Sequence, residues 1–179
     1  MKKLLILFLA AVMAVSSTGC FGGNSTKTEK TIDIVEPDKV SLDDYENTFD
    51  GLVNYFKKIG YILCKENGSS TATETDLNAE VINAKQGKRF QFPYNSSTSS
   101  NVTVELYELY TGENATPSDA VEQIKKNGKF DVLGIDEFEA YLSNNEKYIM
   151  IYTDTKDDDE ENKTRKESAI ELFKAFDRG

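Results

Sequence analysis

The sequence predicts an α+β fold, in which one antiparallel or mixed sheet of about four to five strands is covered on one face by about three helices. Three observations favour this class. Segments with helical spacing and segments with strand alternation both occur, the two kinds do not alternate strictly, and the strand connections suit hairpins. A purely parallel sheet with crossover helices fits this order less well.

The first expected helix covers residues 42–59. Its apolar residues recur mostly three or four positions apart, which places them on one helical face. Ser41 can cap the start, and Gly60 is a natural stop. Two lysines near the end favour the negative end of the helix dipole.

Three elements are expected next. Asp76 can cap the segment 77–84, which we expect to be a short helix, although these residues also tolerate a strand. The alternating segments 88–92 and 102–110 predict two strands. We expect them to form an antiparallel hairpin with a wide loop.

The last part of the chain predicts a helix, two or three strands and a final helix. A capping threonine and a proline favour a helix over 117–127, followed by a short strand over 129–133. Segments 138–142 and 147–152 flank a turn-forming group and predict a hairpin. One apolar face favours a helix over 161–177.

Tyrosines on the strands are the candidate binding residues. In the strand over 102–110, Tyr107 lies opposite the aliphatic side chains of the expected core face. Tyr148 and Tyr152 share one face of the strand over 147–152. If the strands are neighbours, these three tyrosines form an exposed aromatic patch for a protein or small ligand. The alternative is that helices cover them.

Composition and charge exclude several functions. The chain has 31 acidic and 21 basic side chains, a net charge of -10, and therefore repels nucleic acid, which we do not expect as a partner. It has no histidine, which removes histidine-based triads and histidine-ligated metals.

Recognisable catalytic motifs are missing. The sequence has no dinucleotide fingerprint, phosphate-binding loop, nucleophile elbow or Cys-x-x-Cys. We therefore expect a non-enzymatic protein without a cofactor or metal. A carboxylate-based enzyme acting on an envelope polymer stays open, because two acids in a cleft leave no motif. Glu105 and Glu108 are expected on opposite faces, in solvation or a cross-strand pair.

The acidic run over 157–161 offers two interpretations. Several carboxylates at close range suit a calcium ion, but the spacing does not fit the EF-hand loop. We expect a solvated loop that also favours the start of the last helix.

The N-terminus is typical of an export signal. A positive start precedes an apolar run of twelve residues from Leu4 to Val15, which is too short for a bilayer span of about 20 residues. Small residues and Gly19-Cys20 follow this run.

This ending resembles the lipobox of bacterial lipoproteins, except at Ser17, where that family usually has Leu. The resemblance implies cleavage before Cys20, fatty acylation of Cys20, and anchoring to the cell membrane on its extracellular side. Beyond it, a Gly-Lys hairpin followed by Glu-Leu-Tyr-Glu is vaguely similar to small uncharacterised Firmicutes lipoproteins, a similarity that implies no activity.

Three regions follow from these patterns: a signal peptide over 1–19, the lipidated cysteine with a flexible tether over 20–37, and one domain over 38–179. Cys64 then has no partner within the chain, and we expect it to be a small buried residue or a reactive thiol. The expected function is that of an envelope lipoprotein binding or interaction module. A passive surface spacer is the other alternative.

Overall fold

The computed structural model describes residues 35–62, 72–95, 99–112, 118–132 and 136–178. The expected signal peptide, Cys20, most of the tether and Cys64 lie outside these ranges. Within them, no helix has both the length and the apolar character that a membrane crossing requires.

All paired strands run antiparallel. The main sheet has five strands in the order β1-β2-β3-β7-β6, and β4 pairs with β5 in a separate two-stranded sheet. This arrangement confirms the expected α+β class with about five strands and three helices. The strands are β1 (Thr73–Asp76), β2 (Ala84–Phe92), β3 (Val102–Leu109), β4 (Lys129–Val132), β5 (Asp136–Glu139), β6 (Tyr141–Leu142) and β7 (Tyr148–Asp154). The helices are α1 (Phe49–Lys58), α2 (Asp119–Asn127) and α3 (Glu160–Phe176), with short 3₁₀ helices η1 (Pro37–Lys39), η2 (Leu42–Asp44) and η3 (Ala79–Ile82).

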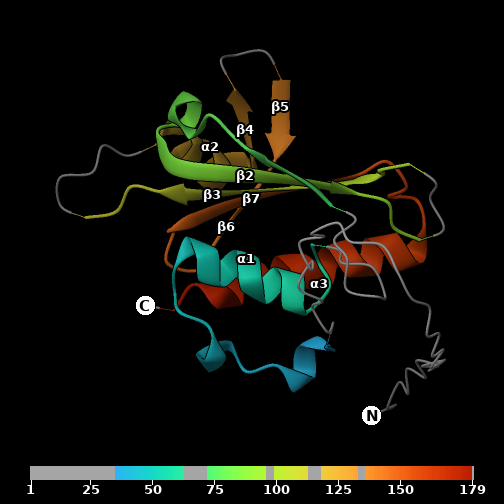
Figure 1. Cartoon of the computed structure of the whole chain (residues 1–179). Coiled ribbons are helices and arrows are strands. Elements are labelled where there is room, and N and C mark those ends of the chain that lie inside the picture. The colour runs from blue at the N-terminus through green and yellow to red at the C-terminus, as the bar shows by residue number, and fades with distance from the viewer. Residues whose placement is uncertain (1–34, 63–71, 96–98, 113–117, 133–135, 179) are drawn as a thin grey trace, which may run out of the picture.

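Helices cover both faces of the main sheet, so the expectation of one covered face is wrong. Figure 1 shows α1 and α3 on one side of the sheet and α2 on the other. One hydrophobic core joins α1 and α3 to the sheet, and a second joins α2 and η3 to the opposite face. The cause is the apolar run Tyr148–Tyr152, which is buried at every position and needs cover on both faces.

The expected helix over 42–59 is correct only in its second part. Ser41 caps the 3₁₀ turn η2, and α1 starts later, where the Thr48 hydroxyl accepts a hydrogen bond from the Gly51 amide at 3.1 Å. Asp, Asn and Thr residues before α1 compete with helical hydrogen bonding and favour a cap. The chain turns back so tightly that a Cβ on Gly51 would lie 2.0 Å from the carbonyl oxygen of Glu46.

The hairpin of β2 and β3 is confirmed, and β2 begins four residues earlier than expected. Strand β1 was not expected from the sequence, because its four residues are polar and exposed and show no apolar alternation. It is a strand because it pairs with the edge of β2. Asp76 ends β1 and caps no helix. In the segment 77–84, only Ala79–Ile82 form a short helical turn, η3, and Ala84 already belongs to β2.

The hairpin of β6 and β7 is also confirmed. The expected strand over 138–142 is interrupted at Ala140, since residues before it pair with β4 and residues after it pair with β7. Helix α3 lies where it was expected. Helix α2 ends before Gly128, as expected, but it starts at Asp119 with Ser118 as its N-cap residue, while the expected cap Thr116 and Pro117 lie outside the described residues.

Contacts of the domain begin slightly before the expected boundary at residue 38. The Val35 amide donates a hydrogen bond to the Lys58 carbonyl oxygen at 2.9 Å, and Val40 packs against the first core. The described part of the tether therefore already belongs to the fold.

Candidate functional site

The three candidate tyrosines do not form an exposed patch. Tyr107, Tyr148 and Tyr152 are 6%, 0% and 1% exposed. They also lie in different cores, Tyr107 under α2 and the other two under α1 and α3. The alternative that helices cover them is the correct one, because both sheet faces are apolar and both are covered.

Tyr107 packs onto a glycine of the neighbouring strand. A Cβ on Gly87 would lie 2.6 Å from the Tyr107 ring, so only glycine leaves room for it. The Tyr107 hydroxyl donates a hydrogen bond to Glu105 Oε2 at 2.7 Å. Burial, followed by the charge of Glu105, raises the pKa of Tyr107 well above its usual value. This tyrosine therefore acts as a neutral packing residue.

Tyr148 and Tyr152 are core residues of the same kind. Burial raises the pKa of Tyr152 to about 12 and also raises the pKa of Tyr148. The Tyr148 hydroxyl has no hydrogen-bond partner among the described residues. Neither ring is available to a partner.

The two glutamates of β3 point to opposite faces, as expected from their spacing. Glu105 forms a cross-strand pair with Arg89, with 2.7 Å between Oε1 and Nε. Glu108 is 7% exposed and accepts a hydrogen bond from Gln86 Nε2 at 2.6 Å. Each acid is thus matched to its own partner, and the two do not share a cleft.

The acidic run over 157–161 supplies the cap of α3. The Asp159 carboxylate accepts hydrogen bonds from the Glu161 and Asn162 amides. In the part of the chain that the structure covers, no group of three or more acidic or cysteine side chains is placed to hold a metal ion. The run thus favours the start of α3, as expected.

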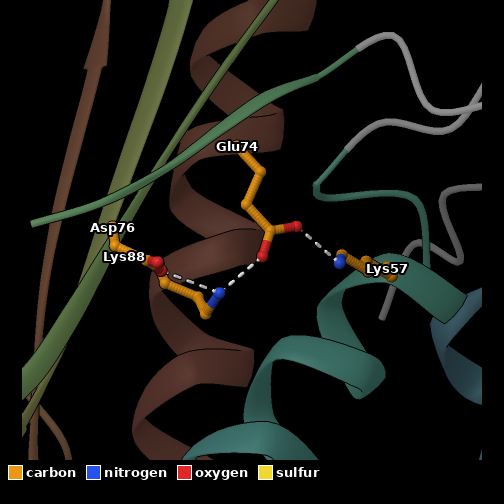
Figure 2. Close-up of polar contacts among 4 residues, drawn as sticks. All are labelled: Lys57, Glu74, Asp76 and Lys88. Atoms are coloured by element: carbon orange, nitrogen blue, oxygen red, sulfur yellow. Dashed lines mark hydrogen bonds and ion pairs between the residues drawn. The ribbon is translucent and has the colours of Figure 1, made fainter.

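A charge cluster ties the edge strand β1 to its neighbours (Figure 2). Glu74 lies between two lysines, 2.9 Å from Lys57 Nζ of α1 and 2.6 Å from Lys88 Nζ of β2. Asp76 lies 3.1 Å from the same Lys88. Burial opposes ionisation of Glu74, but hydrogen bonds from both lysines outweigh it and hold its pKa below the usual value.

We expect Glu74→Gln to destabilise the protein by about 0.5–1 kcal/mol at pH 7, because these pairs are partly exposed and screened by solvent. The folded-state pKa is lowered, so the contribution exists above the ordinary value of 4.5 and is lost as the pH falls through the folded value. Urea unfolding at pH 7 and pH 3 measures both. Glu171→Gln on the exposed side of α3 is the control, and an equal Glu74→Gln effect at both pH values would contradict this assignment.

A pocket of about 410 Å³ lies between the end of α2, the β5–β6 connection and α3. This volume falls within the range of about 300–1,000 Å³ of small-molecule sites. It combines an apolar group with four charged or hydroxyl-bearing side chains. The lining residues are Ile124, Asn127, Gly128, Lys129, Glu139, Ala140, Tyr141, Leu142 and Lys174.

Local backbone geometry creates the pocket. Helix α2 ends at Gly128, which adopts a left-handed conformation with φ 75° and donates a hydrogen bond to the Ile124 carbonyl oxygen at 2.8 Å. The Gly128 carbonyl oxygen then accepts a hydrogen bond from the Ala140 amide at 3.0 Å. Ala140 is the break between β5 and β6, so this bond brings the end of α2 beside the strand connection.

Glu139 is already neutralised by its surroundings. A hydrogen bond from Lys166, at 2.7 Å between Nζ and Oε2, is the main cause that lowers the pKa of Glu139. A hydrogen bond from Tyr141 acts in the same direction. Burial and the same hydrogen bond raise the pKa of Tyr141, which stays a neutral donor.

Two lysines complete the pocket. Lys174 Nζ lies 5.9 Å from the centre of the Tyr141 ring, and Lys129 Nζ lies 3.8 Å from Glu137 Oε2. Sequence reasoning missed this site because its residues come from α2, the β5–β6 connection and α3, and no short motif joins them.

Comparison with protein-family models, with curated proteins and with solved structures finds no match for this chain.

Proposed function

We propose that the protein is a membrane-anchored binding module of the cell envelope, held on the extracellular side by a lipid on Cys20. The pocket between α2, the β5–β6 connection and α3 is its ligand site. The observation that carries this proposal is the pocket itself, where an apolar surface meets Tyr141, Lys129 and Lys174. Such a combination is typical of small-molecule sites, in which few polar groups fix the orientation of a ligand.

A binding role is supported over catalysis by the state of the acids. A general acid at neutral pH needs a raised carboxyl pKa. The shifts on Glu74 and Glu139 have the opposite sign, because lysines hydrogen-bond both carboxylates. The chain also has no histidine to act as a base. A passive spacer, the third candidate, has no use for a pocket with convergent charges.

The binding role is tested by filling the pocket. In full-length protein, Asn127→Phe places a ring at the exposed rim of the site, whereas Glu122→Phe places the same ring on an exposed part of α2 outside the pocket lining. A chemically mixed set of small molecules is screened for binders that raise the melting temperature. We expect binders of the parent chain to lose at least about tenfold in affinity with Asn127→Phe and none with Glu122→Phe. Equal binding by all three chains would refute this site.

The anchor is tested separately. We expect the parent protein to partition into the detergent phase of a Triton X-114 extraction and to incorporate a labelled fatty acid. Cys20→Ser removes the sulfur that would carry the lipid, so it should lose the label. Two or more acyl chains give stable anchoring, whereas one gives only marginal binding. Equal labelling of both chains would show that Cys20 is not the lipidated residue.

A further inference from the structure

We infer that the ligand of this pocket is a small amphipathic anion, with one carboxylate or phosphate group and a short apolar portion. This inference rests on the proposed binding function and specifies its ligand class. It depends on three features of the pocket: a lysine that has no ion-pair partner among the described residues, an acid whose charge is already balanced, and an apolar floor.

The ammonium group of Lys174 is the feature of the pocket that suits an anion. Among the described residues, Lys174 has no ion-pair partner, and its Nζ instead lies 5.9 Å from the Tyr141 ring centre. Lys129 is already compensated, since its Nζ lies 3.8 Å from Glu137 Oε2 in a weak surface pair, with side chains 51% and 66% exposed, and its charge also acts on Glu139. Lysine acts as a point charge and suits carboxylate and phosphate alike.

The other charges around the pocket largely cancel one another. Glu139 is paired with Lys166 and therefore contributes little net negative charge to the pocket. Helices α2 and α3 both end beside the site, and their negative ends contribute about half a charge each. Lys129 is set against Glu137 and Lys166 against Glu139, so the charge of Lys174 meets only these two helix ends. The pocket is therefore close to neutral, whereas the whole chain has a net charge of -10, and Lys174 is the group of the pocket with which an anion can pair.

The apolar portion of the ligand has a matching surface. Ile124 and Ala140 are 7% and 2% exposed, and Leu142 is half-buried beside them. These side chains form an apolar floor next to the charged rim. A volume of about 410 Å³ has room for a ring or a short chain.

Four probes of similar shape test the ligand class: benzoate, phenyl phosphate, benzyl alcohol and benzylammonium. Titration calorimetry with the full-length protein should show that the two anions bind at least about tenfold more tightly than the alcohol, and that benzylammonium binds weakest. The ratio between benzoate and phenyl phosphate decides which anionic group the site prefers. Higher salt should weaken the anions and leave the alcohol unchanged.

Charge variants locate the effect. Lys174→Gln and Lys129→Gln should each lower anion affinity by about 3–10-fold, while Lys163→Gln, on an exposed part of α3, should not. Benzyl alcohol binding as tightly as benzoate, tighter binding of benzylammonium, or no binding by either anion would overturn the anionic class. The binding function would still stand if other small molecules bind and Asn127→Phe removes them, and it would fall if none does.

Discussion

Replacing Tyr107, Tyr148 and Tyr152 together by serine is expected to unfold the protein. All three rings are buried, and they fill two different cores. Truncating a large buried aromatic side chain costs about 3–5 kcal/mol. Three such losses together are as large as the whole free energy of unfolding of a typical domain, which is about 5–15 kcal/mol. Loss of the near-ultraviolet circular dichroism signal and of a cooperative thermal transition measures the effect.

Phenylalanine variants separate the rings from their hydroxyl groups. Tyr148→Phe should be neutral or slightly stabilising, because it removes a buried hydroxyl without a hydrogen-bond partner among the described residues. Tyr107→Phe should cost about 1 kcal/mol, because the Tyr107 hydroxyl donates to Glu105. A triple serine variant that keeps the parent melting temperature would contradict the burial of these rings and restore the exposed patch as a candidate.

Alternation along a strand predicts which side chains share a face, and it did so correctly for β3 and β7. It does not say whether a second layer covers the other face. The run Tyr148–Tyr152 is apolar on both faces of β7, whereas Tyr107 shares its face of β3 with Thr103 and Glu105. Whether such faces are buried depends on the helices that pack on them, and these helices come from distant parts of the chain. The sequence therefore predicts the sheet well and the exposure of its tyrosines poorly.

Local competition explains the other differences. The apolar spacing from Leu42 onward correctly predicts that Leu42 and Tyr45 pack against the first core. Their backbone is not helical up to Thr48, because polar side chains there favour a turn and a new cap. Strand β1 contains no apolar residue from which a strand could be predicted, and it is a strand because it pairs with β2.

The pocket is a consequence of tertiary structure. Gly128 was recognisable as the end of α2, but its hydrogen bond to Ala140 joins residues whose proximity no local pattern specifies. Lys174 reaches the same place from α3 only because α3 packs beside β6. The chemistry of the candidate site thus follows from how α2 and α3 meet one short strand connection.

The second large effect is expected at the end of α3. The Asp177 carboxylate is buried at 3% exposure and accepts hydrogen bonds from the Ser143 hydroxyl at 2.6 Å and from the Asn145 and Lys147 amides at 3.1 and 3.2 Å. The Asn145 side chain also donates to the Asp177 carbonyl oxygen at 2.8 Å. One residue therefore fastens the turn between β6 and β7 to the last helix.

Asp177→Ala leaves three donors without their acceptor, and we expect a loss of about 2–4 kcal/mol in the free energy of unfolding. Urea unfolding at pH 7 measures this loss. The control is Asp158→Ala, at an exposed residue of the turn that precedes α3, which should change the free energy of unfolding by less than about 0.5 kcal/mol. Ser143→Ala removes one of the same hydrogen bonds, so the double variant should lose clearly less than the sum of the two single losses. Additive losses would mean that Asp177 acts apart from the turn. A loss equal to that of Asp158→Ala would mean that the carboxylate does not hold the turn at all.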